Sequence, residues 1–128
     1  MSDFVDAADP DAVAEVLRRA LPAVGLDGLL AQLGAVPGLA VRPGRSRGLL
    51  RAAVPARVSQ GDRTLECGPD GVVLLHVVGG IVLARDAVAP AELPGVLGSL
   101  VSRAAADPAS GEDASVRLTA LRDAVELS

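Results

Sequence analysis

The sequence predicts an α+β fold, in which an antiparallel β-meander of about four or five strands packs against N-terminal and C-terminal helices. Turn dipeptides and Gly/Pro clusters divide residues 49–87 into short apolar runs, which is typical of strands joined by hairpins. Apolar residues at helical spacing stand before and after this region. Residues 1–128 are therefore expected to form a single α+β domain.

The turns fix a strand register that can be checked for consistency. Two-residue turns at residues 61–62 and 79–80, and a tight loop at 68–71, determine which residues lie opposite each other. With this register, one face of the sheet collects the residues expected to form the core. They are Leu50, Ala52, Val54, Ala56, Val58, Leu65, Cys67, Val72, Leu74, His76, Val78, Ile81 and Leu83. A shift of one residue would scatter these side chains over both faces.

The opposite face is predicted to be polar on its first strands and aliphatic on its last two. Its aliphatic half contains the residues expected to form an interface, which are Val73, Leu75, Val77, Val82 and Ala84. Exposed aliphatic patches are normally covered. We therefore expect this half-face to be buried by a helix, a second sheet or another copy of the chain.

Two helical segments are predicted ahead of the sheet. Asp9 and Pro10 are typical N-cap and first-turn residues, and the apolar residues that follow recur at helical spacing. Pro22 is expected to interrupt or kink the helix, and a second apolar stripe continues to Leu33. Residues 1–9 are expected to be a disordered tail.

After the sheet, a helix is predicted to begin at Pro90 and to be deeply buried, because its polar side is thin. Residues 107–113, DPASGED, are expected to form a flexible acidic linker. Residues 115–128 present one apolar face, which predicts a last helix. A short additional strand is possible at residues 39–42.

Composition and charge limit the function. A net charge of -4 and a pI near 4.8 argue against bulk nucleic acid or an anionic membrane as the main partner. The apolar run at residues 72–84 is shorter than the roughly 20 residues that a transmembrane helix needs. One cysteine and an acidic N-terminus favour the cytoplasm. All twelve basic residues are arginines, which indicates a GC-rich bacterial genome.

His76 and Cys67 are the residues most suited to catalysis, but their surroundings favour structural roles. The predicted register places Arg63 and Leu83 beside His76, and a neighbouring cation repels a metal ion. Cys67 is predicted to face inward as a small hydrophobic residue. Neither a phosphate-binding glycine loop nor a set of metal ligands is recognisable. We therefore expect no catalytic residues, no metal and no cofactor.

Half of the arginines lie between residues 42 and 63, a segment whose only acid is Asp62. The candidate anion-binding residues are Arg42, Arg45, Arg47 and Arg51. Guanidinium groups suit phosphate and carboxylate, although a solvated loop is the simpler explanation. Any contact with nucleic acid would be independent of base sequence, because the segment has no aromatic residues for stacking.

In outline, an amphipathic helix followed by an antiparallel meander and a closing helix resembles the dimeric YbaB-type nucleoid proteins. It is also similar to the acidic dimeric chaperones of type III secretion. The stretch LDGLLAQLGAVPGLAV, residues 26–41, resembles the first helix of roadblock-type domains, but the helix that this family has between its strand pairs is missing. Likeness of architecture does not by itself imply a shared function.

The function that the sequence predicts is a non-enzymatic, cytoplasmic homodimer that acts as a protein-interaction or chaperone-like module. Its interface would be the aliphatic half-face. One alternative is a protein that binds anions or nucleic acid through the arginine-rich loop. A second alternative is a carrier of a small apolar ligand.

Overall fold

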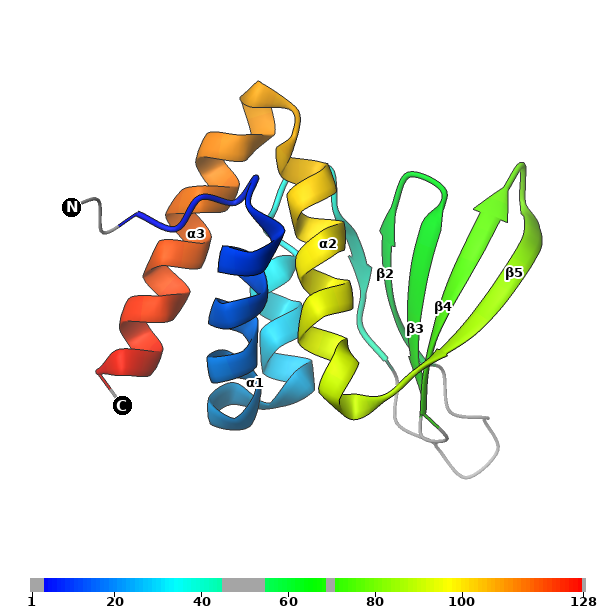
Figure 1. The fold of residues 1–128 in the computed structure, drawn as a ribbon, viewed down its shortest axis with the longest axis horizontal. Helices are drawn as coiled ribbons and strands as arrows, with labels where there is room; N and C mark the ends of the chain where they lie inside the picture. Colours follow the sequence, from blue (N-terminus) through cyan, green and yellow to red (C-terminus); the bar gives the residue numbers. More distant parts are fainter. Residues whose placement is uncertain (1–3, 45–54, 69–70, 128) are drawn as a thin grey trace.

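The computed structural model describes residues 4–44, 55–68 and 71–127, and it confirms the α+β fold (Figure 1). The described elements are α1 (Pro10–Leu33), β1 (Ala40–Arg42), β2 (Ala56–Gln60), β3 (Arg63–Gly68), β4 (Gly71–Val78), β5 (Ile81–Val88), a short 3₁₀-helix (Pro90–Glu92), α2 (Leu93–Ala105) and α3 (Pro108–Glu126). The helices stand on one side of the molecule, and β5 lies at the sheet edge farthest from them (Figure 1).

The sheet is an antiparallel meander in the order β1-β2-β3-β4-β5. The predicted register is confirmed beside each of the three turns, where Gln60 pairs with Arg63, Cys67 with Val72, and Val78 with Ile81. The possible strand at residues 39–42 is present as β1. Residues 49–54, predicted to begin the next strand, lie outside the described residues.

Helix α1 begins as predicted, because the Asp9 carboxylate accepts hydrogen bonds from the amides of Asp11, at 3.0 Å, and Ala12, at 3.4 Å. Pro22 lies inside the helix, and the backbone leaves helical geometry at Gly25, with φ of 76°. The interruption predicted at the proline is therefore a kink centred three residues later. Glycine adopts this left-handed φ at little steric cost.

The core lies between the helices and one face of the sheet. Its fully buried side chains include Val13, Leu17, Leu29, Leu33, Val58, Leu65, Leu97, Val101 and Leu118. Helices α1 and α2 approach closely at Gly98, where an added Cβ would lie 3.0 Å from the Ala14 nitrogen. The sheet residues that join this core come mainly from β2 and β3, so the helices cover only part of the sheet.

The disordered tail predicted at residues 1–9 is contradicted for the part that the structure describes. Val5 and Ala7 are buried. Their amides donate to the hydroxyls of Thr119, at 2.9 Å, and Ser115, at 3.0 Å, both on α3. Val5 and Ala7 therefore pack into the core, whereas Phe4 is 58% exposed, and two side-chain acceptors on α3 fix the backbone of this segment.

The flexible linker predicted at residues 107–113 is also wrong, because α3 begins at Pro108. The Asp107 carboxylate accepts from the amide of Ala109 at 3.2 Å, and proline is favourable in the first turn of a helix. Ser110 is buried, and an added Cβ at Gly111 would lie 2.6 Å from the carbonyl oxygen of Ala105. This segment is therefore a packed first turn of the helix.

Candidate functional site

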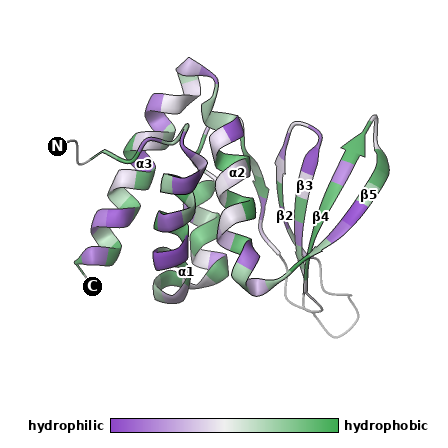
Figure 2. Ribbon diagram, viewed as in Figure 1, coloured by the Kyte–Doolittle hydropathy of each residue, from purple (hydrophilic) through white to green (hydrophobic). Residues whose placement is uncertain are grey.

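The ends of β4 and β5, where the two strands meet, are formed by hydrophobic residues (Figure 2), and four of these residues have exposed side chains. We call this group the hairpin end; it consists of Val78, Ile81, Val82 and Leu83, which are 49%, 65%, 44% and 61% exposed. For three of the four, the prediction of a core position is wrong, because Val78, Ile81 and Leu83 are exposed. The helices do not reach this part of the sheet, so the predicted core face is bare here.

A β-bulge at the hairpin end changes the register of β5. Val77 pairs with Val82, but His76 pairs with Ala84, so Leu83 is the extra residue. The predicted placement of Leu83 beside His76 is therefore wrong. Ala84 lies on the same face as His76, and its predicted place in the interface with Val77 is wrong as well.

The other predicted interface residues do share the sheet face that points away from the helices, which we call the open face. A hollow of about 440 Å³ lies on it. Its lining consists of Ala40, Arg42, Arg57, Ser59, Thr64, Glu66, Leu75, Val77, Gly80, Val82 and Arg85. Leu75 is already 7% exposed in the single chain, whereas Val73 and Val77 are half-buried. Apart from Val82, which it shares with the hairpin end, the predicted half-face is therefore less exposed than the hairpin end.

Arginines from both edges of the sheet contribute to the open face. Arg42 on β1 is exposed and lies opposite Arg57, which forms an ion pair of 3.2 Å with Glu66. Arg85 lies on β5 opposite Leu75. Of the predicted anion-binding residues, Arg42 is the one that the structure describes. Arg45, Arg47 and Arg51 lie outside the described residues. Sequence reasoning missed Arg85 on this face, because its position depends on the bulge.

His76 forms a local hydrogen bond, as the preferred interpretation of the sequence predicted. Its Nε2 lies 2.8 Å from Oδ2 of Asp62, in the turn between β2 and β3. This hydrogen bond holds the pKa of Asp62 below its ordinary value of 3.8. Arg103 on α2 lies 3.6 Å from the same carboxylate. The partner could have been found from the register, because Asp62 precedes Arg63, which lies opposite His76.

The described residues offer little chemistry for catalysis or metal binding. Nowhere along residues 4–44, 55–68 and 71–127 do three or more His, Cys, Asp or Glu side chains gather as metal ligands would. Cys67 is buried, and burial raises the pKa of its thiol, with a further contribution from Glu66. A buried thiol of raised pKa is a poor nucleophile. In the same part of the chain, no helix has both the length and the apolar character needed to cross a bilayer.

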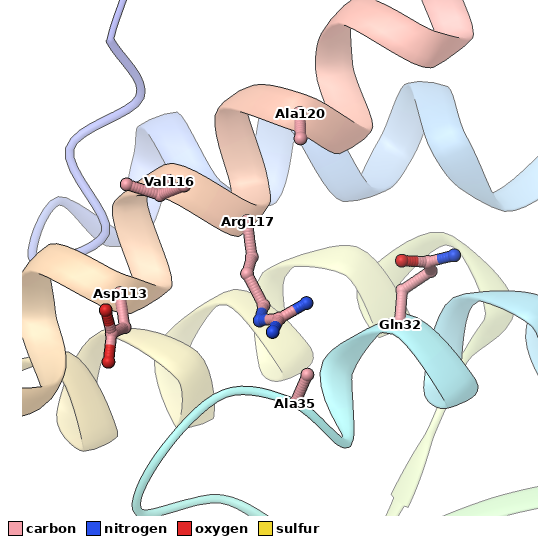
Figure 3. A pocket seen from close by; sticks show the side chains of 6 residues that line it. All are labelled: Gln32, Ala35, Asp113, Val116, Arg117 and Ala120. Carbon is pink, nitrogen blue, oxygen red and sulfur yellow. The ribbon is translucent and has the colours of Figure 1, made fainter.

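A hollow of about 360 Å³ lies between α3 and the end of α1 (Figure 3). Its lining consists of Gln32, Ala35, Asp113, Val116, Arg117 and Ala120. Arg117 extends from α3 toward Ala35, and Asp113 lies farther along the same helix (Figure 3). One guanidinium and one carboxylate among small side chains do not form a nucleophile and a base, so this hollow lacks catalytic chemistry.

A more apolar hollow of about 500 Å³ lies beside α1, β1 and the start of β2. Its lining consists of Asp27, Leu30, Ala31, Gly34, Ala35, Val41, Pro43, Gly44 and Ala56. This is where a small apolar ligand would fit if the chain were a carrier. Ligand sites normally enclose most of the ligand surface, and the described lining does not form such an enclosure.

Helices on one face of a five-stranded meander, with an aliphatic hairpin end and an open face that carries arginines, define a small α+β protein whose most distinctive features are surfaces. Residues 5–126 match the family described as "domain of unknown function (DUF5073)", and the chain belongs to this family. Neither the curated proteins nor the solved structures include a match to the chain.

Proposed function

We propose that this chain is a non-enzymatic, cytoplasmic protein-interaction module that forms a homodimer through its hairpin end. The observation that carries the proposal is the exposure of four adjacent aliphatic side chains, of which Ile81 and Leu83 are the most exposed at 65% and 61%. Exposing such a cluster to water is unfavourable, and clusters of this kind mark sites of association.

The architecture around the hairpin supports the need for a partner. Domains normally bury a sheet face under a second layer, but the helices pack mainly on the β1 to β3 side of this sheet. Every residue of β5 from Ile81 to Ala87 is exposed. A second copy would supply the missing layer, since it brings the same patch and an isologous contact covers both patches at once.

The two hairpins would associate by packing their side chains, not by joining their edges. Arg85 and Asp86 lie on the edge strand β5, close to the bulge at Leu83. Edge charges and bulges oppose pairing between the edges of two sheets. Because a standard interface buries about 800 Å² on each partner, the contact would extend from the hairpin end onto β5.

The test is the molar mass of the chain in solution, measured by sedimentation velocity and by light scattering after gel filtration. The wild type should be dimeric at about 100 µM if the contact reaches this standard size. Ile81→Asp and Leu83→Asp should each be monomeric at this concentration, with an unchanged circular dichroism spectrum. Leu127→Asp is the matched control, because Leu127 is 88% exposed and lies after α3.

Two results would overturn the proposal. If the wild-type chain stays monomeric at about 100 µM, the hairpin end does not mediate self-association. A dimer that survives both substitutions, or that Leu127→Asp disrupts equally, has its interface elsewhere.

A further inference from the structure

We propose that the open face is a docking site for an acidic amphipathic helix of another protein. This site goes beyond the proposed dimer, because the open face is the opposite side of the sheet from Val78 and Ile81, and Val82 is the one hairpin-end residue that lines the hollow. The inference depends on the shape of the face, on its aliphatic strip and on its charge.

The dimensions of the open face fit a helix. An eight-residue strand such as β4 is about 26 Å long, and five strands span about 19 Å between the outer two. A helix with its side chains is about 10 to 12 Å across. A helix of about 16 residues would therefore lie along the hollow of about 440 Å³ and leave both sheet edges available to flanking side chains.

An aliphatic strip runs along one side of the hollow. Val77 on β4 and Val82 on β5 supply its accessible surface, while Leu75 beside them is only 7% exposed. The hydroxyls of Ser59 and Thr64 lie on β2 and β3 in the same lining. The two hydroxyls lie 3.1 Å apart and hydrogen-bond to each other. Because these hydroxyls satisfy part of each other's hydrogen-bonding capacity, covering them with an apolar partner costs less. The strip is therefore suited to the apolar stripe of an amphipathic helix.

The charge of the open face selects an acidic partner. The lining holds three arginines and one acid, Glu66, and that acid already pairs with Arg57. Within the described residues, neither Arg42 nor Arg85 forms an ion pair. The face is thus positive on a chain whose net charge is -4. Carboxylates on both sides of a helix would complement the arginines at the two edges.

The same observations disfavour other occupants. A second copy of the chain would bring its own open-face arginines against these ones, which is unfavourable. A nucleic-acid backbone would satisfy the arginines but would leave Val77 and Val82 without an apolar partner, and the lining of the hollow has no aromatic side chain for base stacking.

The test uses two designed helical peptides of about 16 residues with the same leucine stripe. One peptide carries glutamates beside the stripe, and the other carries lysines at those positions. Fluorescence anisotropy with the full chain should show at least tenfold tighter binding of the glutamate peptide. The double variant Arg42→Gln/Arg85→Gln should weaken that binding roughly tenfold, since two exposed ion pairs are lost. The control is Arg117→Gln, on α3.

A second measurement locates the peptide. In ¹⁵N correlation spectra, the glutamate peptide should shift the amides of β2 to β5 that belong to the hollow, and binding should persist in the Ile81→Asp variant. The Ile81→Asp variant tests the docking site independently of the dimer. If the dimer proposal is wrong, the expected peptide binding does not change.

Several results would overturn the inference. They are the absence of binding of the glutamate peptide at about 1 mM, equal binding of the lysine peptide, and binding that is insensitive to the double arginine variant. A 20-base-pair DNA duplex that binds more tightly than the glutamate peptide, and loses its binding in the same variant, would instead assign the arginines to polyanions.

Discussion

His76 Nε2 lies 2.8 Å from Asp62 Oδ2, and this contact joins the second half of β4 to the turn between β2 and β3. The same turn accepts a backbone hydrogen bond of 2.7 Å from Val77. Arg103 lies 3.6 Å from the Asp62 carboxylate. Asp62 therefore connects the β4–β5 hairpin to α2, and its charge contributes to the position of the hairpin relative to the helices.

The contribution of Asp62 to stability should depend on pH. The pKa of this carboxyl is lower in the folded chain, mainly because of the hydrogen bond from His76. A group of lowered pKa stabilises the fold above its unfolded pKa, and this contribution disappears as the pH falls through its folded pKa. The stability difference between wild type and Asp62→Asn, from urea unfolding, should therefore be present at about pH 6 and shrink below about pH 4. A difference that stays constant down to about pH 3 would contradict this.

The register of the sheet could be predicted because glycine turns are local signals. Gly79 and Gly80 both adopt positive φ, of 59° and 81°, and a turn of this kind joins strands at a fixed register. The bulge at Leu83 could not be predicted, because nothing in the residues around it marks an extra position. For that reason the sheet face predicted for each residue of β5 is correct up to Val82 and wrong for Ala84.

The glycine turn itself should tolerate asparagine at its first position and resist a branched residue at its second. Gly79→Asn should change the free energy of unfolding by less than about 0.5 kcal/mol, because asparagine accepts positive φ. Gly80→Val should destabilise by about 1–2 kcal/mol, since valine is strained in that conformation. Denaturant unfolding measures both. Equal effects of the two substitutions would show that the turn conformation is not what matters here.

The N-terminal segment and the first turn of α3 were mispredicted because tertiary contacts order them. Neither segment has a strong hydrophobic period, and DPASGED is typical of a linker. Asp107 and Pro108 were nevertheless a detectable helix start, of the same kind as Asp9 and Pro10, which were recognised. The burial of Val5 left no comparable signal, because its acceptor on Thr119 is 114 residues away.

The arginines of the candidate surfaces illustrate the same limit. Their concentration between residues 42 and 63 was visible in the sequence, but the pairing of Arg42 opposite Arg57 needed β1 to be placed beside β2. Arg85 joins the same face only through the bulge. Local patterns therefore predicted a positive segment, and the three-dimensional register turned part of it into a surface.

The hydroxyl of Thr119 should hold the N-terminal segment in place. It accepts the amide of Val5 at 2.9 Å and donates to the carbonyl of Ser115 at 2.7 Å. Thr119→Val keeps the shape but removes the acceptor, so it should destabilise by about 1–3 kcal/mol and speed hydrogen exchange at the Val5 amide. Thr119→Ser is the control and should keep that amide protected. Fast exchange in the wild type would mean that the segment is not held by this bond.

The junction between α2 and α3 should reject a methyl group at Gly111. An added Cβ would lie 2.6 Å from the Ala105 carbonyl oxygen, which belongs to the backbone and cannot rotate away. Gly111→Ala should therefore lower the free energy of unfolding by about 1–3 kcal/mol, as overpacking does. Gly95 in α2 provides the matched control, because nothing lies within 4 Å of its added Cβ. Gly95→Ala should stabilise by up to about 1 kcal/mol through helix propensity. Urea unfolding measures the free energy of unfolding of both variants. A Gly111→Ala variant that is more stable than the wild type would mean that the first turn of α3 does not pack against the end of α2.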